Sequence, residues 1–167
     1  MTGTTLHIPT LRTAHFVMRA PKASDLPAYD AFRTSERARG VGGPYPTSQS
    51  HDKLCSLIGH WLIEGYGRWI VADQDDNPLG VVGLMTAPDW PEPEIGWSVF
   101  GGSEGKGVAF EAAVESRRYA YEVLGWPTVI SCVMPDNNRS RALAERLGAT
   151  FERTHRHAEL GPLEIWR

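Results

Sequence analysis

The chain has 167 residues, of which 41% are hydrophobic and 22% charged. These proportions are those of an ordinary globular protein, so they favour neither a disordered chain nor a coiled coil. Seventeen basic and 20 acidic residues give a formal net charge of −3, which argues against broad nucleic-acid binding. The length is that of one domain with a real hydrophobic core, and we expect a single domain over residues 1–167.

No segment of the sequence predicts a membrane or export function. The longest strongly apolar runs, such as LGVVGLM at 79–85, are too short to cross a bilayer. The first ten residues, MTGTTLHIPT, lack the charged and apolar regions of a signal peptide. We therefore expect a cytoplasmic protein with no membrane partner. Cys55 and Cys132 lie in separate predicted elements, which favours reduced structural thiols over a disulfide or a metal site.

One strand and two helices are predicted in the first part of the chain. Residues 14–20 alternate like a short strand, and Ser24 with Asp25 can cap a helix that runs to about residue 38. The loop GVGGPYPTS then ends at Ser48, which can cap the second helix, and Gly65 suits the end of that helix. The buried face of the second helix is predicted from the i, i+3, i+4, i+7, i+8 spacing to be Leu54, Leu57, Ile58, Trp61 and Leu62.

Three strands follow, over 68–73, 79–86 and 94–100. Their connections, QDDNP and APDWPEP, are short enough to make them antiparallel neighbours. The third strand leads through a glycine loop into a helix that runs to about residue 124. An apolar strand over 128–134 comes next, and a strand, helix and strand of this length form a βαβ unit, so strands 94–100 and 128–134 should be parallel.

The last predicted helix starts near PDNNRS and stops at Gly148, and a terminal strand pair can follow it. The whole order reads βααβββαβαβ. We therefore predict an α/β (α+β) fold, in which a mixed, mostly antiparallel sheet is flanked by helices.

The glycine loop GGSEGKG, residues 101–107, leads directly into an alanine-rich helix. A glycine loop between a strand and a helix lets the backbone approach an anion, and the free N–H groups of the first helical turn point at that anion. This arrangement is typical of phosphate binding. A Walker loop is excluded, because Phe100 stands where its first glycine belongs and Gly107 where its Ser or Thr belongs. The dinucleotide fingerprint fits poorly, because it meets Phe110 at its third glycine.

SEGKGVAFEAA resembles the coenzyme A loop of the GNAT superfamily of N-acetyltransferases. GKGVAFEA, residues 105–112, is similar to the G-x-G-y-A-x-E-A form of the branch related to ribosomal-protein N-terminal acetyltransferases, although Gly102 stands where that superfamily often has Gln or Arg. DNNRSRALAERLGA resembles the N-x-x-S motif of the next helix, through Asn137 and Ser140. TAHFVMRAPKASDLPAY resembles the opening segment of the same branch, with Arg19 and Asp25 in place.

The resemblance implies that a neutral amine attacks the thioester of acetyl-CoA directly, without a covalent acyl-enzyme. Such a reaction needs a base for the amine, donors for the oxyanion and a donor for the departing thiolate. We expect Glu94 to be the base, with a solvated strand-end carboxylate as the alternative and Glu92 as a weaker candidate. The resemblance places Ser140 near the thioester sulfur, and Ser140 is favoured as the donor because Ala144 replaces the tyrosine often found four positions further on. The alternative role of Ser140 is a hydrogen bond within the first turn of its own helix, where serine is common.

The coenzyme, acetyl-CoA, is expected to bind to main-chain groups at the end of strand 94–100 and to the glycine loop. Asn137 is a further candidate, whose alternative role is a helix cap. Trp90, Trp97 and Tyr45 can border the acceptor, while Trp61 and Trp69 fit core faces. The predicted coenzyme-binding residues are Trp97, Ser98, Val99, Gly105, Lys106, Gly107, Val108, Ala109 and Asn137.

Three functions remain open at the level of the sequence. The first is an acetyl-CoA-dependent N-acetyltransferase acting on a peptide N-terminus or a small-molecule amine. The second is a coenzyme A binding or sensing domain without catalysis, and the third is a glycine loop that serves only the fold, which the three matching segments disfavour. No metal is expected, because the histidines lack a ligand spacing. The family analogy is compatible with a homodimer, and the acceptor is not fixed by the fold.

Overall fold

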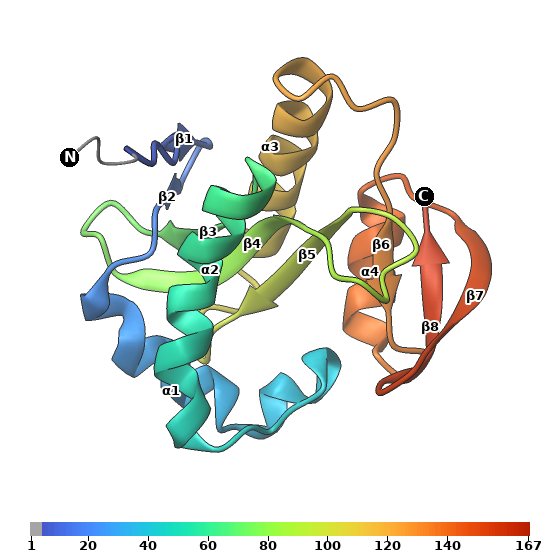
Figure 1. Ribbon diagram of the computed structural model, residues 1–167, viewed down its shortest axis with the longest axis horizontal. Helices are drawn as coiled ribbons and strands as arrows, with labels where there is room; N and C mark the ends of the chain where they lie inside the picture. The colour runs from blue at the N-terminus through green and yellow to red at the C-terminus, as the bar shows by residue number, and fades with distance from the viewer. Residues whose placement is uncertain (1–4) are drawn as a thin grey trace.

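Two antiparallel sheets form the centre of the computed structural model, which describes residues 5–167 (Figure 1). The strand order is β1-β2-β3-β4-β5 in the first sheet and β6-β8-β7 in the second. The first sheet consists of β1 (Leu11–Arg12), β2 (Val17–Arg19), β3 (Arg68–Ala72), β4 (Pro78–Met85) and β5 (Glu94–Val99). The second consists of β6 (Ser131–Val133), β7 (Phe151–His157) and β8 (Gly161–Trp166).

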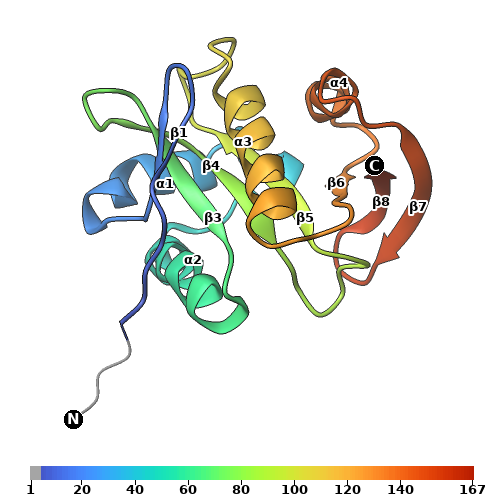
Figure 2. The same ribbon diagram turned by 90° about the horizontal axis from the view of Figure 1, so that it is seen from above.

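Helices cover both faces of the first sheet. One core cluster joins α3 (Val108–Glu122) to Trp69, Val71 and Val82, whereas a second cluster joins α1 (Leu26–Arg33) and α2 (Ser50–Glu64) to Ile70 and Val81. Because alternate residues of a strand point to opposite faces, these two clusters lie on opposite sides of the sheet. The fourth helix, α4 (Asn138–Arg146), packs on the second sheet, and Figure 2 shows these elements together beside β5.

The predicted parallel pair of strands exists at one point only. Glu94 and Ile130 form a single parallel bridge, and the Ile95 N–H donates to the Ile130 carbonyl at 2.9 Å. Beyond this bridge β6 pairs antiparallel with β8 instead of with β5. The predicted mixed sheet is therefore divided in two, and β5 and β6 separate toward the end of β5 that precedes the glycine loop.

The predicted helix over residues 24–38 is wrong in its extent, because α1 ends at Arg33 and a 3-10 turn covers Glu36–Val41. The Thr34 and Ser35 hydroxyls donate to carbonyls of the last turn of α1, at 2.9 and 2.7 Å. Ser35 then takes an extended conformation (φ −91°, ψ 162°). Short hydroxyl side chains that bond to the local backbone compete with helix continuation.

The second predicted helix is confirmed, with two corrections. It begins at Ser50, after a 3-10 turn over Thr47–Gln49, and Ser48 does not cap it. Leu62 is 54% exposed, because the buried stripe of α2 is narrow and follows Leu54, Leu57 and Trp61. Trp61 and Trp69 are core residues, as their positions predict, and they meet edge-to-face at 4.8 Å between ring centroids.

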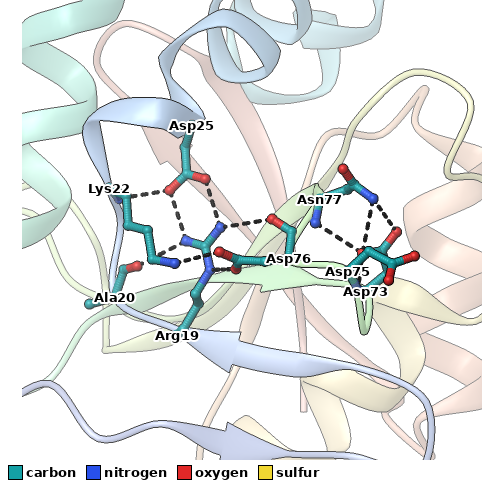
Figure 3. Close-up of polar contacts among 8 residues, drawn as sticks. All are labelled: Arg19, Ala20, Lys22, Asp25, Asp73, Asp75, Asp76 and Asn77. Atoms are coloured by element: carbon teal, nitrogen blue, oxygen red, sulfur yellow. Dashed lines mark hydrogen bonds and ion pairs between the residues drawn. The ribbon is translucent and has the colours of Figure 1, made fainter.

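A buried ion pair fixes the connection between β2 and α1 (Figure 3). Two nitrogens of Arg19 donate to the two carboxylate oxygens of Asp25 at 2.9 and 2.8 Å, and the two side chains are 9% and 1% exposed. Asp25 also accepts the Lys22 backbone N–H at 2.7 Å. Asp76, from the turn between β3 and β4, contacts Arg19 and Lys22 from the other side. The pair thus holds three segments of the chain together.

We predict that Asp25→Asn lowers the free energy of unfolding by about 2 to 3 kcal/mol, because it leaves a buried guanidinium without its bidentate partner. Urea unfolding followed by circular dichroism measures this loss. Lys22→Met is the matched control: it removes an ion pair in which both side chains are about half exposed, and it should leave the unfolding midpoint almost unchanged. Equal effects of the two substitutions would contradict the stabilising role of the buried pair.

Candidate active site

A cleft of about 640 Å³ opens where β5 ends, between the glycine loop and α4. Its wall includes the first turn of α3 on one side and Ser140, Leu143 and Arg146 of α4 on the other. The predicted coenzyme residues that line it are Trp97, Ser98, Val99, Gly105, Gly107, Val108, Ala109 and Asn137. The sequence motifs on either side of β5 therefore meet at one concave surface.

The glycine loop presents backbone N–H groups to this cleft. Gly107 is the N-cap of α3, with φ 83°, and no side chain caps the helix there. The first N–H that bonds within the helix is that of Glu111, to the Gly107 carbonyl at 3.0 Å. The preceding N–H groups, including those of Val108 and Ala109, are free to bind an anion, as at other helix N-termini. A residue with a Cβ would be strained at the positive φ of Gly107.

The carboxylate of Glu111, in the first turn of α3, is held by the turn between β1 and β2. It accepts hydrogen bonds from the Thr13 hydroxyl at 2.6 Å and the His15 backbone N–H at 3.2 Å. The His15 ring lies 2.6 Å from its other oxygen. Burial opposes ionisation of this group, but the hydrogen bonds from Thr13 and His15 outweigh it and lower the pKa of Glu111. The helix therefore carries a fixed negative charge beside its positive end.

A second, more enclosed cavity of about 170 Å³ adjoins the cleft and contains Glu94. Cleft and cavity share part of their walls, so the two spaces are adjacent. The shared residues are Gly40, Val41, Trp97, Ser98, Asn137 and Ser140. The cavity extends from there between β5 and β6, along the gap that opens beyond the Glu94–Ile130 bridge.

Glu94 is the most strongly perturbed carboxyl group in this region. Its side chain is buried, and one oxygen accepts the Cys132 backbone N–H at 2.6 Å. Burial raises the pKa of Glu94 to about 7, while the hydrogen bond from Cys132 acts in the opposite direction. The indole nitrogen of Trp90 also lies near enough to lower this pKa, although it has no hydrogen-bond geometry to any described residue. A carboxyl group with this pKa exchanges a proton readily near neutral pH.

Ser140 and Trp97 form a hydrogen-bonded pair at the junction of cleft and cavity. The Trp97 indole N–H donates to the Ser140 hydroxyl oxygen at 3.1 Å. Because an indole N–H is a donor only, the hydroxyl is the acceptor in this bond and its own proton remains available to another acceptor. Asn137 caps α4, since its side chain accepts the Ser140 backbone N–H at 3.2 Å. The capping role, which the sequence left as an alternative, is thus seen in the structure.

The free edge of β5 faces the gap. The Ile95 N–H and carbonyl both bond across it, to Ile130 and to the Ser131 hydroxyl, whereas the Phe100 N–H bonds to Leu79 of β4. Since main-chain groups alternate in direction along a strand, those of Trp97 and Val99 face the gap and those of Ser98 face β4. A main-chain contact from Ser98 to the coenzyme is therefore not supported, and its side chain is what lines the walls.

Three residues considered for the site from the sequence line neither space. Lys106 is exposed and lines neither space, and Tyr45 donates its hydroxyl to the Val41 carbonyl at 2.5 Å instead of lining the acceptor cavity. Glu92, the weaker candidate base, is ion-paired with Arg167 at 2.7 Å. By contrast, Trp90 does line the Glu94 cavity.

Three arginines line the cleft in place of Lys106: Arg37, Arg139 and Arg146. Arg37 comes from the 3-10 turn after α1 and its guanidinium donates to the Val99 carbonyl at 3.4 Å. Arg146 stacks on the Phe110 ring, 4.0 Å from its centroid. Neither could be found from a local motif, because each reaches the cleft through the tertiary fold.

Two general features of the described chain bear on function. Among residues 5–167, no cluster of three or more His, Cys, Asp or Glu side chains is arranged to hold a metal ion. Within the same residues, no helix has the length and apolar character needed to cross a membrane.

Comparisons with known proteins agree with this geometry. The family model described as "Acetyltransferase (GNAT) domain" matches residues 15–150. An acetyltransferase from Agrobacterium tumefaciens is 35% identical over 99% of this chain and 97% of its own, with a TM-score of 0.87.

More distant solved structures share the fold. A putative ribosomal-protein-serine acetyltransferase from Vibrio cholerae is 16% identical over 98% of both chains, with a TM-score of 0.79. A ribosomal-protein α-N-acetyltransferase in complex with coenzyme A is 17% identical over 95% of this chain and 96% of its own, with a TM-score of 0.72. By the family model and the Agrobacterium structure, this chain belongs to the GNAT family and is an N-acetyltransferase.

Proposed function

We propose that the protein transfers the acetyl group of acetyl-CoA to a primary amine, of a peptide N-terminus or a small molecule, by direct attack. The observation that carries this proposal is the buried Glu94 carboxyl group, with a pKa of about 7, in a cavity that opens into the cleft beside the glycine loop. A coenzyme-sensing domain would not need a base at this point. The two spaces provide one place for the thioester and another for the amine.

The residues of the cleft fit the phosphates and the pantetheine arm of coenzyme A. The free N–H groups at the start of α3 suit the pyrophosphate, and Arg139 and Arg146 add positive charge along the same wall. The main-chain groups of Trp97 and the N–H of Val99 at the open edge of β5 suit the amides of the pantetheine arm, because β6 leaves them unpaired. The Val99 carbonyl, by contrast, accepts from Arg37. A backbone N–H at this edge also supplies a donor for the oxyanion.

Glu94 takes the proton of the amine in this proposal. An amine reacts only in its neutral form, and a carboxylate that is desolvated in the cavity is a stronger base than one in water. Ser140 then serves the leaving thiolate: the hydroxyl accepts from Trp97 and donates toward the sulfur. Since a serine hydroxyl is a weak acid, its contribution is a hydrogen bond rather than full proton transfer.

We predict that Glu94→Gln lowers kcat at least 100-fold, with little change in the Kd for acetyl-CoA, because it removes the base and leaves the cleft intact. In the wild type kcat/KM should rise with pH as Glu94 deprotonates near pH 7, and the variant should lack this dependence. Steady-state kinetics from pH 5.5 to 9 and calorimetric titration with acetyl-CoA measure both effects. Glu92→Gln, two residues away and outside the cavity, is the control and should stay within a few-fold of wild type. Wild-type turnover in the Glu94 variant would remove this residue from the mechanism.

The burial of Glu94 also has a consequence for stability. Its pKa is higher in the folded chain than in the unfolded chain, so the folded state holds the proton more tightly and stability falls as the pH rises from about 4.5 to 7. We predict that Glu94→Gln weakens this loss, so that the variant gains stability relative to wild type between pH 5 and pH 8. Denaturant unfolding at the two pH values tests the sign. A relative loss at pH 8 would show that the ionised form is well accommodated.

For the coenzyme, we predict that Gly107→Val weakens acetyl-CoA binding at least 10-fold, since a branched side chain distorts the N–H groups at the start of α3. Gly125→Val is the matched control. Gly125 lies beyond the other end of α3 with a similar φ of 70°, so its substitution introduces comparable backbone strain away from the cleft. Titration calorimetry of both variants separates the two effects, and unchanged affinity in Gly107→Val would refute the phosphate role of the loop.

For the leaving group, we predict that Ser140→Ala lowers kcat by about 10-fold while the affinity for acetyl-CoA changes little. The substitution keeps the helix cap, because Asn137 binds the backbone N–H of this residue and not its hydroxyl. Trp97→Phe removes only the indole donor and should cost less. If both variants lose the same activity, the Trp97–Ser140 bond orients the site and the hydroxyl has no separate role.

A further inference from the structure

The Glu94 cavity also contains a positively charged side chain without a partner. Arg68, at the start of β3, lines this cavity, and its guanidinium makes no hydrogen bond or ion pair with any residue in the range 5–167. Most other arginines of the chain that are similarly covered contact carboxylates, as Arg19 and Arg167 do. An unpaired guanidinium in an enclosed space is costly, and such groups are normally paired.

The sheet brings Arg68 and Glu94 to the same face. Arg68 pairs with Gly83 of β4, and Gly83 pairs with Gly96 of β5, so these three residues form one cross-strand row. Glu94 precedes Gly96 by two residues and therefore shares its face. Because neither glycine has a side chain and β3 and β5 lie about 10 Å apart, the Arg68 side chain reaches the cavity across the sheet.

The Arg68 guanidinium is covered by protein atoms, but no carboxylate of the described residues pairs with it. Arg68 lines the cavity, and burial lowers the pKa of its guanidinium, with the Glu94 charge acting in the opposite direction. No ion pair joins the Arg68 guanidinium to the Glu94 carboxylate, so their nitrogen and oxygen atoms lie more than 4.0 Å apart. The cavity thus presents one cation and one carboxyl group, separated from one another, within walls that are otherwise neutral.

One further observation favours a ligand with acceptor groups in this cavity. Trp90 lines the cavity, and its buried indole N–H, which lies near Glu94, has no hydrogen-bond partner among the described residues. The unmatched groups that the cavity presents, the Arg68 guanidinium and the Trp90 indole N–H, are therefore both donors, which a ligand meets with acceptors.

We infer that the acceptor amine carries a carboxylate, which binds to Arg68 while the amino group lies at Glu94; the acceptor is then a free amino acid. The inference rests on the proposed function. A cavity of about 170 Å³ is smaller than the 300 to 1,000 Å³ usual for larger ligands, and this size suits a molecule of a few heavy atoms beyond its charged groups. The ammonium and carboxylate groups of an amino acid complement the two charges of the cavity. The apolar wall, which includes Met85, Leu160 and Leu163, suits an apolar side chain.

The test compares three forms of one acceptor: leucine, leucinamide and 3-methylbutylamine, with methionine and methioninamide as a second set. Coenzyme A release is measured at saturating acetyl-CoA. We expect kcat/KM for the amino acids to exceed that for the amides and the simple amine by roughly 10- to 100-fold, the effect of a lost charge-assisted hydrogen bond in an enclosed site. The amide amino group loses its proton more readily, so its intrinsic reactivity opposes this result.

Arg68→Met should remove the preference by lowering kcat/KM for the amino acids alone, and Arg68→Lys should restore part of it. Arg12→Met, at an exposed position of β1, is the control and should behave like wild type. If Arg68 only adjusts the ionisation of Glu94, Arg68→Met would instead shift the pH profile equally for acid and amide, and the inference would fail. The wild-type comparison decides the question even if the methionine variant does not fold.

The outcomes distinguish this inference from the proposed function. Amides or amines acetylated as fast as the amino acids, or a preference for peptides with a blocked carboxyl end, overturn the carboxylate contact and leave the acetyltransferase proposal standing. If no amine of either set causes coenzyme A release, the free amino acid is excluded as the acceptor and the inference fails, whereas transfer to other primary amines, such as peptide N-termini, is tested separately by the Glu94 and Gly107 variants.

Discussion

The separation of β5 from β6 is the constraint on which the site depends. A sheet gains stability from every strand pair that it closes, yet here two neighbouring strands share one parallel bridge, at Glu94 and Ile130, and then diverge. The divergence exposes the main-chain edge of β5, opens the cleft toward α3 and leaves space for the Glu94 cavity. Pairing is recovered elsewhere, because β6 joins β8 and β7 in a second sheet. The local loss of hydrogen bonds is thus the origin of both binding spaces.

Much of the fold could be predicted from local patterns, and the failures have both local and tertiary causes. The central strands, α2, α3 and the glycine loop follow from periodicity and turn residues, because each is decided by neighbours in sequence. The predicted extent of α1 is wrong, because the Thr34 and Ser35 hydroxyls bond to carbonyls of its last turn. The predicted burial of Leu62 is wrong, because the buried stripe of α2 is narrow. Likewise, Glu94 could be chosen from its strand, but Arg68 could not, because its relation to Glu94 arises only through the register of three strands.

Glu94 and Glu111 are both carboxyl groups near the site, but their surroundings shift their pKa values in opposite directions. Glu94 is buried with one backbone donor, so that burial dominates and its proton is held up to about pH 7. Glu111 is bonded by Thr13 and His15, so that hydrogen bonding dominates and the group stays ionised. The first is suited to exchange protons and the second to keep a fixed charge. Residue type alone does not separate these roles, whereas the number of donors around each group does.

The attachment of Glu111 to the turn between β1 and β2 has a consequence for the electrostatics of the cleft. A carboxylate in the first turn of α3 would repel a pyrophosphate if it were free to swing toward it. Thr13 and His15, almost one hundred residues earlier in the chain, engage both of its oxygens. The turn between β1 and β2 therefore holds the Glu111 carboxylate away from the position proposed for the pyrophosphate. If this turn moved away from α3, the carboxylate would be free to approach that position and would repel a bound phosphate.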